Sequence, residues 1–264
     1  MNGWLSSVIS YRYFIVSSVR NELLNQFARS RLGGLWMIIQ PLVRVAIYAF
    51  VLSAVLRARL DGIDSQYAYA IYLTSGILGW TLFSDVLSRC LNLFVGNANL
   101  LKKMVVPKVT LPLIALGAAL VNNVLLFGAR LLIFALLGHW PSPVLLWLPL
   151  LTLVLLLLAL GLGLIVAVLN VFIRDVAQVI PIVLQLLFWF TPILYPAVII
   201  PEHLRHWLLF NPLYPLISGY QSVLAYQRAP ELLPVLAVGV LALLLCRLGC
   251  WMARQANAEM VDVL

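Results

Sequence analysis

Charged residues are scarce in this chain of 264 residues. Only 10% of the residues are Asp, Glu, Lys or Arg, whereas 64% are hydrophobic, and the mean hydropathy is +1.05. A composition this apolar excludes the class of soluble globular proteins. Apolar runs of about 20 residues recur along the chain, and each is long enough to cross a hydrocarbon core of about 30 Å. The sequence therefore predicts a protein that crosses the membrane several times.

The long apolar runs also lack the alternation of apolar and polar residues that marks membrane β-strands. One of them reads LLWLPLLTLVLLLLALGLGLIVAVL and is apolar at nearly every position. Backbone polar groups in lipid need partners within the chain, so the spanning elements must be helices. We predict an all-α membrane protein of one transmembrane domain (residues 1–264). Its six spans are expected near residues 35–56, 68–95, 113–137, 144–172, 176–195 and 232–251.

Side chains for catalysis or metal binding are few as well. The nine acidic residues form no obvious pair facing a pocket, and the chain has three histidines. Glu202, His203 and His206 are spaced to share one helical face, either as metal ligands or as a polar rim at the outer surface. We predict the rim, and neither a catalytic nor a metal site. No G-x-x-x-x-G-K-[ST] phosphate loop occurs, so the chain does not hydrolyse ATP by that machinery.

Basic residues are divided unequally between the two sides of the predicted spans. Nine lie on one side, at Arg12, Arg20, Arg29, Arg31, Lys102, Lys103, Lys108, Arg174 and Arg254. Four lie on the other side, at Arg57, Arg59, Arg205 and Arg228. Because cytoplasmic loops carry the excess of Lys and Arg, both termini are expected in the cytoplasm. No basic surface domain is present that would favour a nucleic-acid partner.

Two segments are predicted to be neither spans nor ordinary loops. In residues 11–31 an apolar residue recurs at every fourth position, namely Ile15, Val19, Leu23 and Phe27. This pattern is typical of a helix that lies in the membrane interface with its apolar side down. Residues 196–230 are too apolar for a solvated loop and too interrupted by Pro and Gly to span. We predict an extracytoplasmic re-entrant or interfacial hairpin there, between spans five and six.

Charged residues inside the spans are costly and are therefore candidate functional residues. We single out Arg44, Asp85, Arg89 and Arg130, with Arg174 and Asp175 at the junction of spans four and five. Asp85 and Arg89 stand four residues apart, which predicts a local ion pair. Arg44 either extends to the cytoplasmic interface or faces a conduit, and both interpretations stay open. Arg174 and Asp175 are interpreted as a cap of the junction or as a topology anchor.

The chain's only lysines lie in NANLLKKMVVPKVTLP (residues 97–112). As the positive charge of a cytoplasmic loop near anionic lipid, they contribute about 1 kcal/mol per basic residue. The segment also has the pattern of a short amphipathic helix that Asn97 or Asn99 caps and Pro107 ends. The apolar face of this helix comprises Leu100, Leu101, Met104 and Val105. We favour the second interpretation, a docking surface for a soluble partner.

Aromatic residues gather in FWFTPILYP, at Phe188, Trp189, Phe190 and Tyr195. They form either an interfacial aromatic belt, which membrane proteins have in general, or a stacked surface that contacts sugar rings. The sequence leaves both interpretations open.

Four stretches in the same order resemble one family, the polysaccharide-exporting ABC permeases of the type-2 class. The start of that family's span one resembles RSRLGGLWMIIQPL (residues 29–42), and its first coupling loop resembles NANLLKKMVVPKVTLP. Its span four-to-five junction resembles NVFIRDVAQVIPIVLQLLFWFTPILYP (residues 170–196), and its outer hairpin resembles NPLYPLISGYQSVL (residues 211–224). The stretches extend over nearly the full length. The resemblance is greatest to Wzm-type O-antigen exporters, with teichoic acid and capsule permeases close to them.

The resemblance implies a transport subunit rather than an enzyme. Permeases of this family form homodimers and bind two copies of a separate ATPase, which holds ATP and Mg, so no cofactor is expected in this chain. The implied cargo is a polysaccharide on undecaprenyl diphosphate. It would leave the cytoplasm through a channel at the dimer interface in the bacterial inner membrane.

The resemblance also implies roles for particular residues. ATPase coupling is expected at Asn97, Leu100, Leu101, Lys102, Lys103, Met104 and Lys108. At a lateral entrance gated by the interface helix, Arg29 and Arg31 are expected to bind the lipid diphosphate. Spans one and five are expected to line the channel, with candidate sugar contacts at Trp36, Tyr48, Phe188, Trp189, Phe190 and Tyr195. A secondary transporter or channel remains the alternative, favoured by Arg44 and Arg130, although no internal repeat is found.

Overall fold

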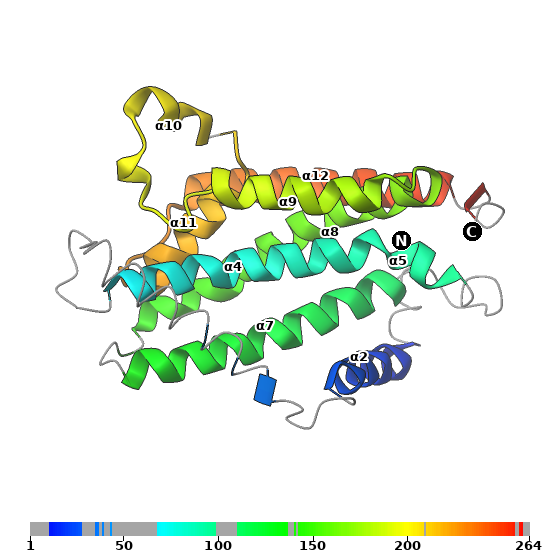
Figure 1. Cartoon of the computed structure of the whole chain (residues 1–264), viewed down its shortest axis with the longest axis horizontal. Coiled ribbons are helices and arrows are strands. Elements are labelled where there is room, and N and C mark those ends of the chain that lie inside the picture. The colour runs from blue at the N-terminus through cyan, green and yellow to red at the C-terminus, as the bar shows by residue number, and fades with distance from the viewer. Residues whose placement is uncertain are drawn as a thin grey trace.

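The computed structural model describes residues 11–27, 35–36, 39, 43, 68–98, 110–136, 140, 142–208, 210–256 and 259–260. Every regular element in these ranges is a helix, as the sequence predicts. The long helices form a bundle (Figure 1) and are α4 (Ala68–Leu91), α7 (Thr110–Leu136), α8 (Leu148–Phe172), α9 (Val176–Phe190) and α12 (Leu232–Gln255). Successive members alternate in direction. The α8–α9 turn and the end of α12 therefore lie at one end of the bundle, and α10 (Glu202–Leu208) and α11 (Leu213–Leu224) lie at the other.

The described helices agree with four of the six predicted spans. Helices α4, α7, α8 and α12 are long and apolar enough to cross a membrane, and they begin and end within a few residues of the predicted positions. Helix α9 has 15 residues and ends at Phe190 rather than near residue 195. The prediction was wrong there because Pro192 has no N–H to donate and its ring disfavours helical backbone at Thr191. The predicted span at residues 35–56 lies outside the described residues, apart from Leu35, Trp36, Ile39 and Val43.

Helix α8 packs against both α12 and α4 and holds much of the core. Its fully buried side chains include Leu151, Leu155 and Leu158. Two glycines of α8 allow its neighbours to come close. A Cβ added at Gly161 would lie 2.7 Å from the backbone nitrogen of Cys246 in α12, and one at Gly163 would lie 2.6 Å from the Cβ of Cys90 in α4. Such close approach at small residues is typical of helix packing in membranes.

Residues 196–230 divide into an exposed part and a buried helix. The short η4 (Ala197–Ile199) and α10 stand away from the bundle, whereas α11 packs against α4 and α8. The side chains of Leu216, Ile217 and Tyr220 in α11 are fully buried. Pro215 and Gly219 do not interrupt α11, since a proline is tolerated in the first turn of a helix.

The N-terminal helix α2 (Arg12–Phe27) is present and lies beside α7. The sequence predicts that the stripe through Val19 faces lipid. Instead, Val19 packs on Gly117 of α7, where an added Cβ would lie 3.0 Å from the Val19 Cγ2 atom. Apolar side chains on the other faces of α2, such as Val16 and Leu24, are exposed. Helix α2 is therefore held by protein contacts along one face.

Candidate functional site

A charged contact joins α2 to α4. The Nε atom of Arg89 donates to the Oδ1 atom of Asp85 at 2.8 Å, so the ion pair predicted from the four-residue spacing is present. The Nη1 atom of Arg89 also pairs with Glu22 of α2, a partner that the sequence pattern does not identify. The Arg89 side chain is 15% exposed, and the Oδ2 atom of Asp85 is buried with no hydrogen-bond partner among the described residues. Arg89 thus ties the N-terminal helix to the bundle.

The contact lies about two turns before Asn97, where the lysine-bearing segment of the sequence (residues 97–112) begins. Helix α4 ends at Leu91, and the one-turn α5 (Leu93–Gly96) follows directly. Asn170 of α8 donates to the carbonyl of Leu91 at 2.8 Å and so satisfies a group that the break between the helices releases. Asn97 ends α5, and its side-chain amide donates to the carbonyl of Leu93 at 2.8 Å. The chain is therefore fixed to α8 just before it leaves for residues 99–109.

Helix α9 is packed lightly for a helix within a bundle. Leu184 is its only buried residue, and Gln178 and Gln185 are exposed. At its end Trp189 is 58% exposed and Phe190 is 70% exposed. Most of this helix is therefore not covered by the other helices that the structure describes.

One aromatic side chain holds the end of α9 against α4. The ring of Phe188 makes an edge-to-face contact with Trp80 of α4 at a centroid distance of 5.4 Å, and a second one with Trp189 at 5.8 Å. Such pairs contribute about 0.5–1.5 kcal/mol beyond the area they bury. Phe188 therefore packs inwards, while Trp189 and Phe190 remain accessible.

The segment after α9, residues 191–195, which we call the anchor segment, is not helical, and its carbonyls receive side-chain donors. The Nε2 atom of Gln221 in α11 donates to Pro192 at 3.2 Å and to Ile193 at 3.4 Å. The hydroxyl of Tyr69 in α4 donates to the carbonyl of Leu194. The hydroxyl of Tyr72, also in α4, donates to the carbonyl of Tyr195 at 3.3 Å. Four consecutive carbonyls are thus satisfied from two other helices.

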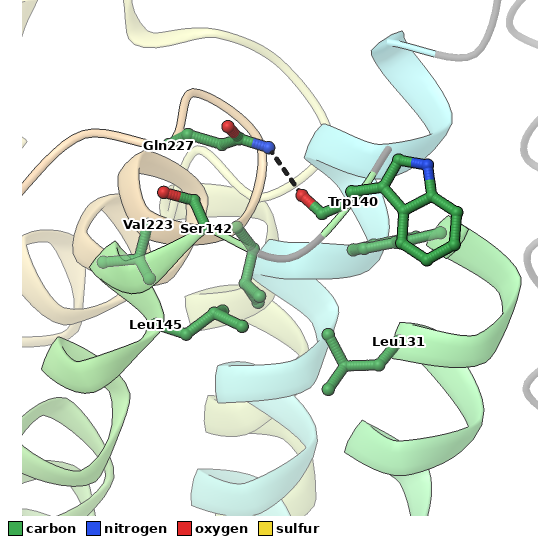
Figure 2. A pocket seen from close by; sticks show the side chains of 8 residues that line it. Leu131, Trp140, Ser142, Leu145, Val223 and Gln227 are labelled. Carbon is green, nitrogen blue, oxygen red and sulfur yellow. Dashed lines mark hydrogen bonds between the residues drawn. The ribbon is translucent and has the colours of Figure 1, made fainter. Parts of the chain in front are cut away.

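A small cavity lies where α7, the short 3-10 helix η3 (Pro143–Trp147) and α11 meet at the same end of the bundle. Its lining residues (Figure 2) are Leu131, Phe134, Trp140, Ser142, Leu145, Val223, Leu224 and Gln227. The Nε2 atom of Gln227 donates to the carbonyl of Trp140 at 3.0 Å. The cavity has room for about one water molecule, so it is no path for a large substrate.

Comparison with known proteins identifies the family. A sequence profile described as ABC-2 type transporter matches residues 13–225. The chain belongs to the ABC-2 type transporter family. An O-antigen export system permease protein RfbA of Myxococcus xanthus is 27% identical over 237 residues, which is 89% of each chain. A protein of the same name from Klebsiella pneumoniae is 28% identical over 225 residues, 81% of this chain and 82% of its own. The polysialic acid transport protein KpsM of Escherichia coli is 25% identical over 73% of each chain.

Several residues expected to act in this ABC-2 permease lie outside the described ranges. They are the coupling residues Leu100, Leu101, Lys102, Lys103, Met104 and Lys108, the gate residues Arg29 and Arg31, and also Tyr48 and Arg44. Trp36 is described and is exposed. The structure brings Phe188, Trp189, Phe190 and Tyr195 together at one end of α9, where the Tyr195 hydroxyl donates to the carbonyl of Trp189 at 2.7 Å. Their contact with a substrate stays a prediction.

The remaining polar candidates separate into buried and exposed groups. Arg130 is buried in α7. Asn123 lies two turns earlier on the same face of α7, is also buried, and donates to the carbonyl of Leu78 in α4 at 3.2 Å. Arg174 and Asp175 are exposed in the turn between α8 and α9, and the Asp175 side chain makes no capping hydrogen bond to α9. The described residues contain no group of three His, Cys, Asp or Glu side chains placed to hold a metal ion.

Sequence reasoning missed the donors to the anchor segment, although a signal for them exists. Two prolines, Pro192 and Pro196, interrupt the helical pattern in TPILYP and leave carbonyls without helical partners. A glutamine, Gln221, stands in the otherwise apolar stretch that forms α11. Buried polar groups are nearly always hydrogen-bonded. A glutamine in an apolar helix and carbonyls without helical partners together predict that the Gln221 amide donates to the carbonyls near Pro192.

Proposed function

We propose that this ABC-2 permease is the membrane subunit of an ATP-driven polysaccharide exporter with an O-antigen-like cargo. The single observation that carries the proposal is the match to proteins named as O-antigen export permeases over 81% to 89% of the chain. A second cargo, a capsule polysaccharide, is supported by the match to a polysialic acid transport protein over 73% of the chain. The longer match favours the first cargo.

The proposed subunit is a single domain with six spans. Four of these are α4, α7, α8 and α12, and the other two are residues 35–56 and α9. Residues 35–56 are apolar enough to span. Helix α9 with its 15 residues is about 22 Å long, less than a hydrocarbon core of about 30 Å, so the anchor segment would complete the crossing. Non-helical backbone at membrane depth is tolerated when protein surrounds it, which the donors from α4 and α11 support. Helix α11, buried between α4 and α8, would be the re-entrant part of residues 196–230.

A separate ATPase would drive the transport, since this chain has no phosphate loop. Two copies of the ATPase would bind a homodimer of the permease at the helix expected in residues 97–108. The fixed end of α5 supports this assignment, because a push on the loop would be passed to α4 and α8 rather than absorbed. Through Arg89 and Glu22 the same push would reach α2.

The cargo would be linked to undecaprenyl diphosphate and would enter beside α2, where Arg29 and Arg31 would bind the diphosphate. It would then pass along a channel between two subunits, bounded by span one and by the exposed face of α9. The exposed Trp189 and Phe190 support this path, because aromatic faces contact sugar rings without strong directional bonds. The protein would lie in the bacterial inner membrane with both termini in the cytoplasm.

The proposal is tested by restoring export. A strain that lacks its own polysaccharide permease would receive this chain together with its partner ATPase, and surface polysaccharide would be measured. We expect polymer at the surface with the active ATPase and none when the phosphate-loop lysine of the ATPase is replaced. Polymer at the surface with the inactive ATPase would instead support a secondary transporter or channel. Absence of polymer with both would refute export by this chain.

A second experiment tests the coupling residues. The tagged permease should bring down its ATPase from detergent extracts, and replacement of Leu100 and Leu101 by Asp should abolish this capture, because an apolar docking face would become charged. Replacement of Leu233, an exposed residue at the first turn of α12 at the opposite end of the bundle, serves as the matched control. Equal capture by all three proteins would exclude residues 97–108 as the docking helix.

A further inference from the structure

We propose that the anchor segment is the pivot of α9, and that Gln221, Tyr69 and Tyr72 are positioning residues that hold it. The inference rests on the proposed export function and assigns a role to residues that touch no substrate. In this arrangement the aromatic end of α9 stays in place during transport, while the other end of the helix moves.

The first argument is that all five carbonyls of the anchor segment accept hydrogen bonds. The amide of Thr191 donates to Leu187 at 2.8 Å, and the amide of Ile193 donates to the carbonyl of Thr191 at 2.7 Å. The carbonyls of residues 192–195 accept hydrogen bonds from the side chains of Gln221, Tyr69 and Tyr72. Each buried bond would cost the desolvation of an unpaired group if it were broken. The segment is therefore fixed in one conformation.

The second argument is that the anchor segment also receives a donor from the chain just before α11. The side-chain amide of Asn211 donates to the Oγ1 atom of Thr191 at 2.8 Å. The Asn211 side chain is itself held, because its Oδ1 atom accepts from the amide of Leu213 at 3.0 Å. Thr191 is fully buried, so water cannot replace this donor. Thr191, the first residue of the anchor segment, is thus also tied to the chain that leads into α11.

The third argument is that the donors are held as firmly as the carbonyls they bind. Gln221 is buried beside Gly76 of α4, where an added Cβ would lie 2.8 Å from the Gln221 Nε2 atom. The neighbouring Tyr220 pairs its hydroxyl with the Oγ1 atom of Thr152 in α8 at 2.7 Å. Helices α4, α8 and α11 thus form one body to which the anchor segment is joined.

The fourth argument concerns the rest of α9, which few of the described residues cover. Its first turn follows an exposed turn at Arg174 and Asp175, and Leu184 is its only buried residue. Pro181 inside the helix removes one backbone hydrogen bond and weakens the helix at that point. A helix that is fixed at one end and loosely packed along the rest moves by rotation about the fixed end. Trp189 and Phe190 then remain at a constant position, while the end near residue 176 swings.

The test uses variants that remove donors with little change of shape. Tyr72→Phe removes one hydroxyl, and Gln221→Met removes the amide donors at similar length. Tyr220→Phe is the matched control, since it removes an equally buried bond of α11 that goes to α8 and not to the anchor segment. Hydrogen exchange of the amides of Thr191 and Ile193 would be measured in the membrane-inserted homodimer with its ATPase, together with polymer exported per ATP hydrolysed.

We expect Tyr72→Phe to speed exchange at these amides about five-fold, the factor that corresponds to one hydrogen bond of about 1 kcal/mol. Export per ATP should fall several-fold in both anchor variants. Tyr220→Phe should leave both quantities as in the wild type, because the fully buried side chains of Leu216 and Ile217 still hold α11 in place without the Tyr220 bond. A merely structural role would lower the amount of protein and scale export and ATP hydrolysis together.

Three outcomes would overturn the pivot. They are unchanged exchange at the anchor segment, unchanged export per ATP, or the same loss in Tyr220→Phe as in the anchor variants. If Gln221→Met does not reach the membrane, Tyr72→Phe alone decides. If the wild-type chain exports nothing, the proposed function fails, whereas exchange at Thr191 and Ile193 still measures whether the donors hold the segment.

Discussion

Gly161 lies where α8 touches the backbone of α12, and replacing it with Ala should destabilise the protein. The added Cβ would lie 2.7 Å from the backbone nitrogen of Cys246, and 2.8 Å and 2.9 Å from the Cβ and the carbonyl carbon of Leu245. Backbone atoms cannot rotate away as a side chain can, so α12 would have to shift. Helix α12 lies against α8 along much of its length, and the Sγ atom of Cys246 donates to the carbonyl of Leu157 at 3.1 Å.

The magnitude follows from two opposing terms. Overpacking of a close contact costs about 1–3 kcal/mol. Alanine favours the helical backbone over glycine by about 1 kcal/mol, which offsets part of that cost. The net loss should be up to about 2 kcal/mol, or a fall of up to about 8 °C in the unfolding midpoint of a chain of this size.

Gly128→Ala is the matched control, because a Cβ at Gly128 in α7 meets no atom within 4 Å in the described part of the chain. This control should gain up to about 1 kcal/mol from helix propensity alone. Both variants would be unfolded by heating in the same detergent, and their unfolding midpoints would be measured from the change in near-ultraviolet circular dichroism. A Gly161→Ala protein that melts at or above Gly128→Ala would refute the close contact between α8 and α12.

Two further predictions concern the charged contact and the aromatic end of α9. In a double-mutant cycle, the losses of unfolding free energy caused by Glu22→Gln and Arg89→Gln should differ from additivity by about 1 kcal/mol. This value lies between those of exposed and buried ion pairs. Additive losses would show that this contact does not tie α2 to α4. Replacement of Trp189 and Phe190 by Ala should reduce surface polysaccharide with no loss of protein. Phe210 is another highly exposed aromatic residue but lies outside α9, so Phe210→Ala should not reduce it. Unchanged polymer in the α9 variant would refute the sugar contact.

The order and direction of the helices could be predicted because lipid forces each apolar run to satisfy its backbone internally. The end of α9 could have been placed correctly from Pro192, whose effect on the preceding residue is local. The pair between Glu22 and Arg89 could not be predicted, because the two residues are 67 positions apart and helical periodicity gives a face but no partner. For the same reason the pattern of α2 indicated an apolar stripe, yet did not reveal that α7 covers it.

The candidate site was predicted unevenly for a physical reason. The grouping of Phe188 and Trp189 follows from adjacency in one helix. The donors Tyr69 and Gln221 join the site only because α4 and α11 fold against each other. Gln221 stands out as a polar residue in an apolar stretch, but no residue spacing within α4 identifies Tyr69 as a donor. The coupling and gate residues stay predictions, because they lie outside the described residues.

The burial of α11 between α4 and α8 constrains how the protein is made. Synthesis runs from the N-terminus, and α4 and α8 are complete before residues 213–224 leave the ribosome. Until then the space that Leu216, Ile217 and Tyr220 later fill stays empty, and the hydroxyl of Thr152 lacks its tyrosine partner. The first three-quarters of the chain therefore cannot close its own core. Assembly of the bundle has to wait for a segment that is synthesised late. The incomplete subunit therefore depends on factors that shield unfinished membrane bundles during insertion.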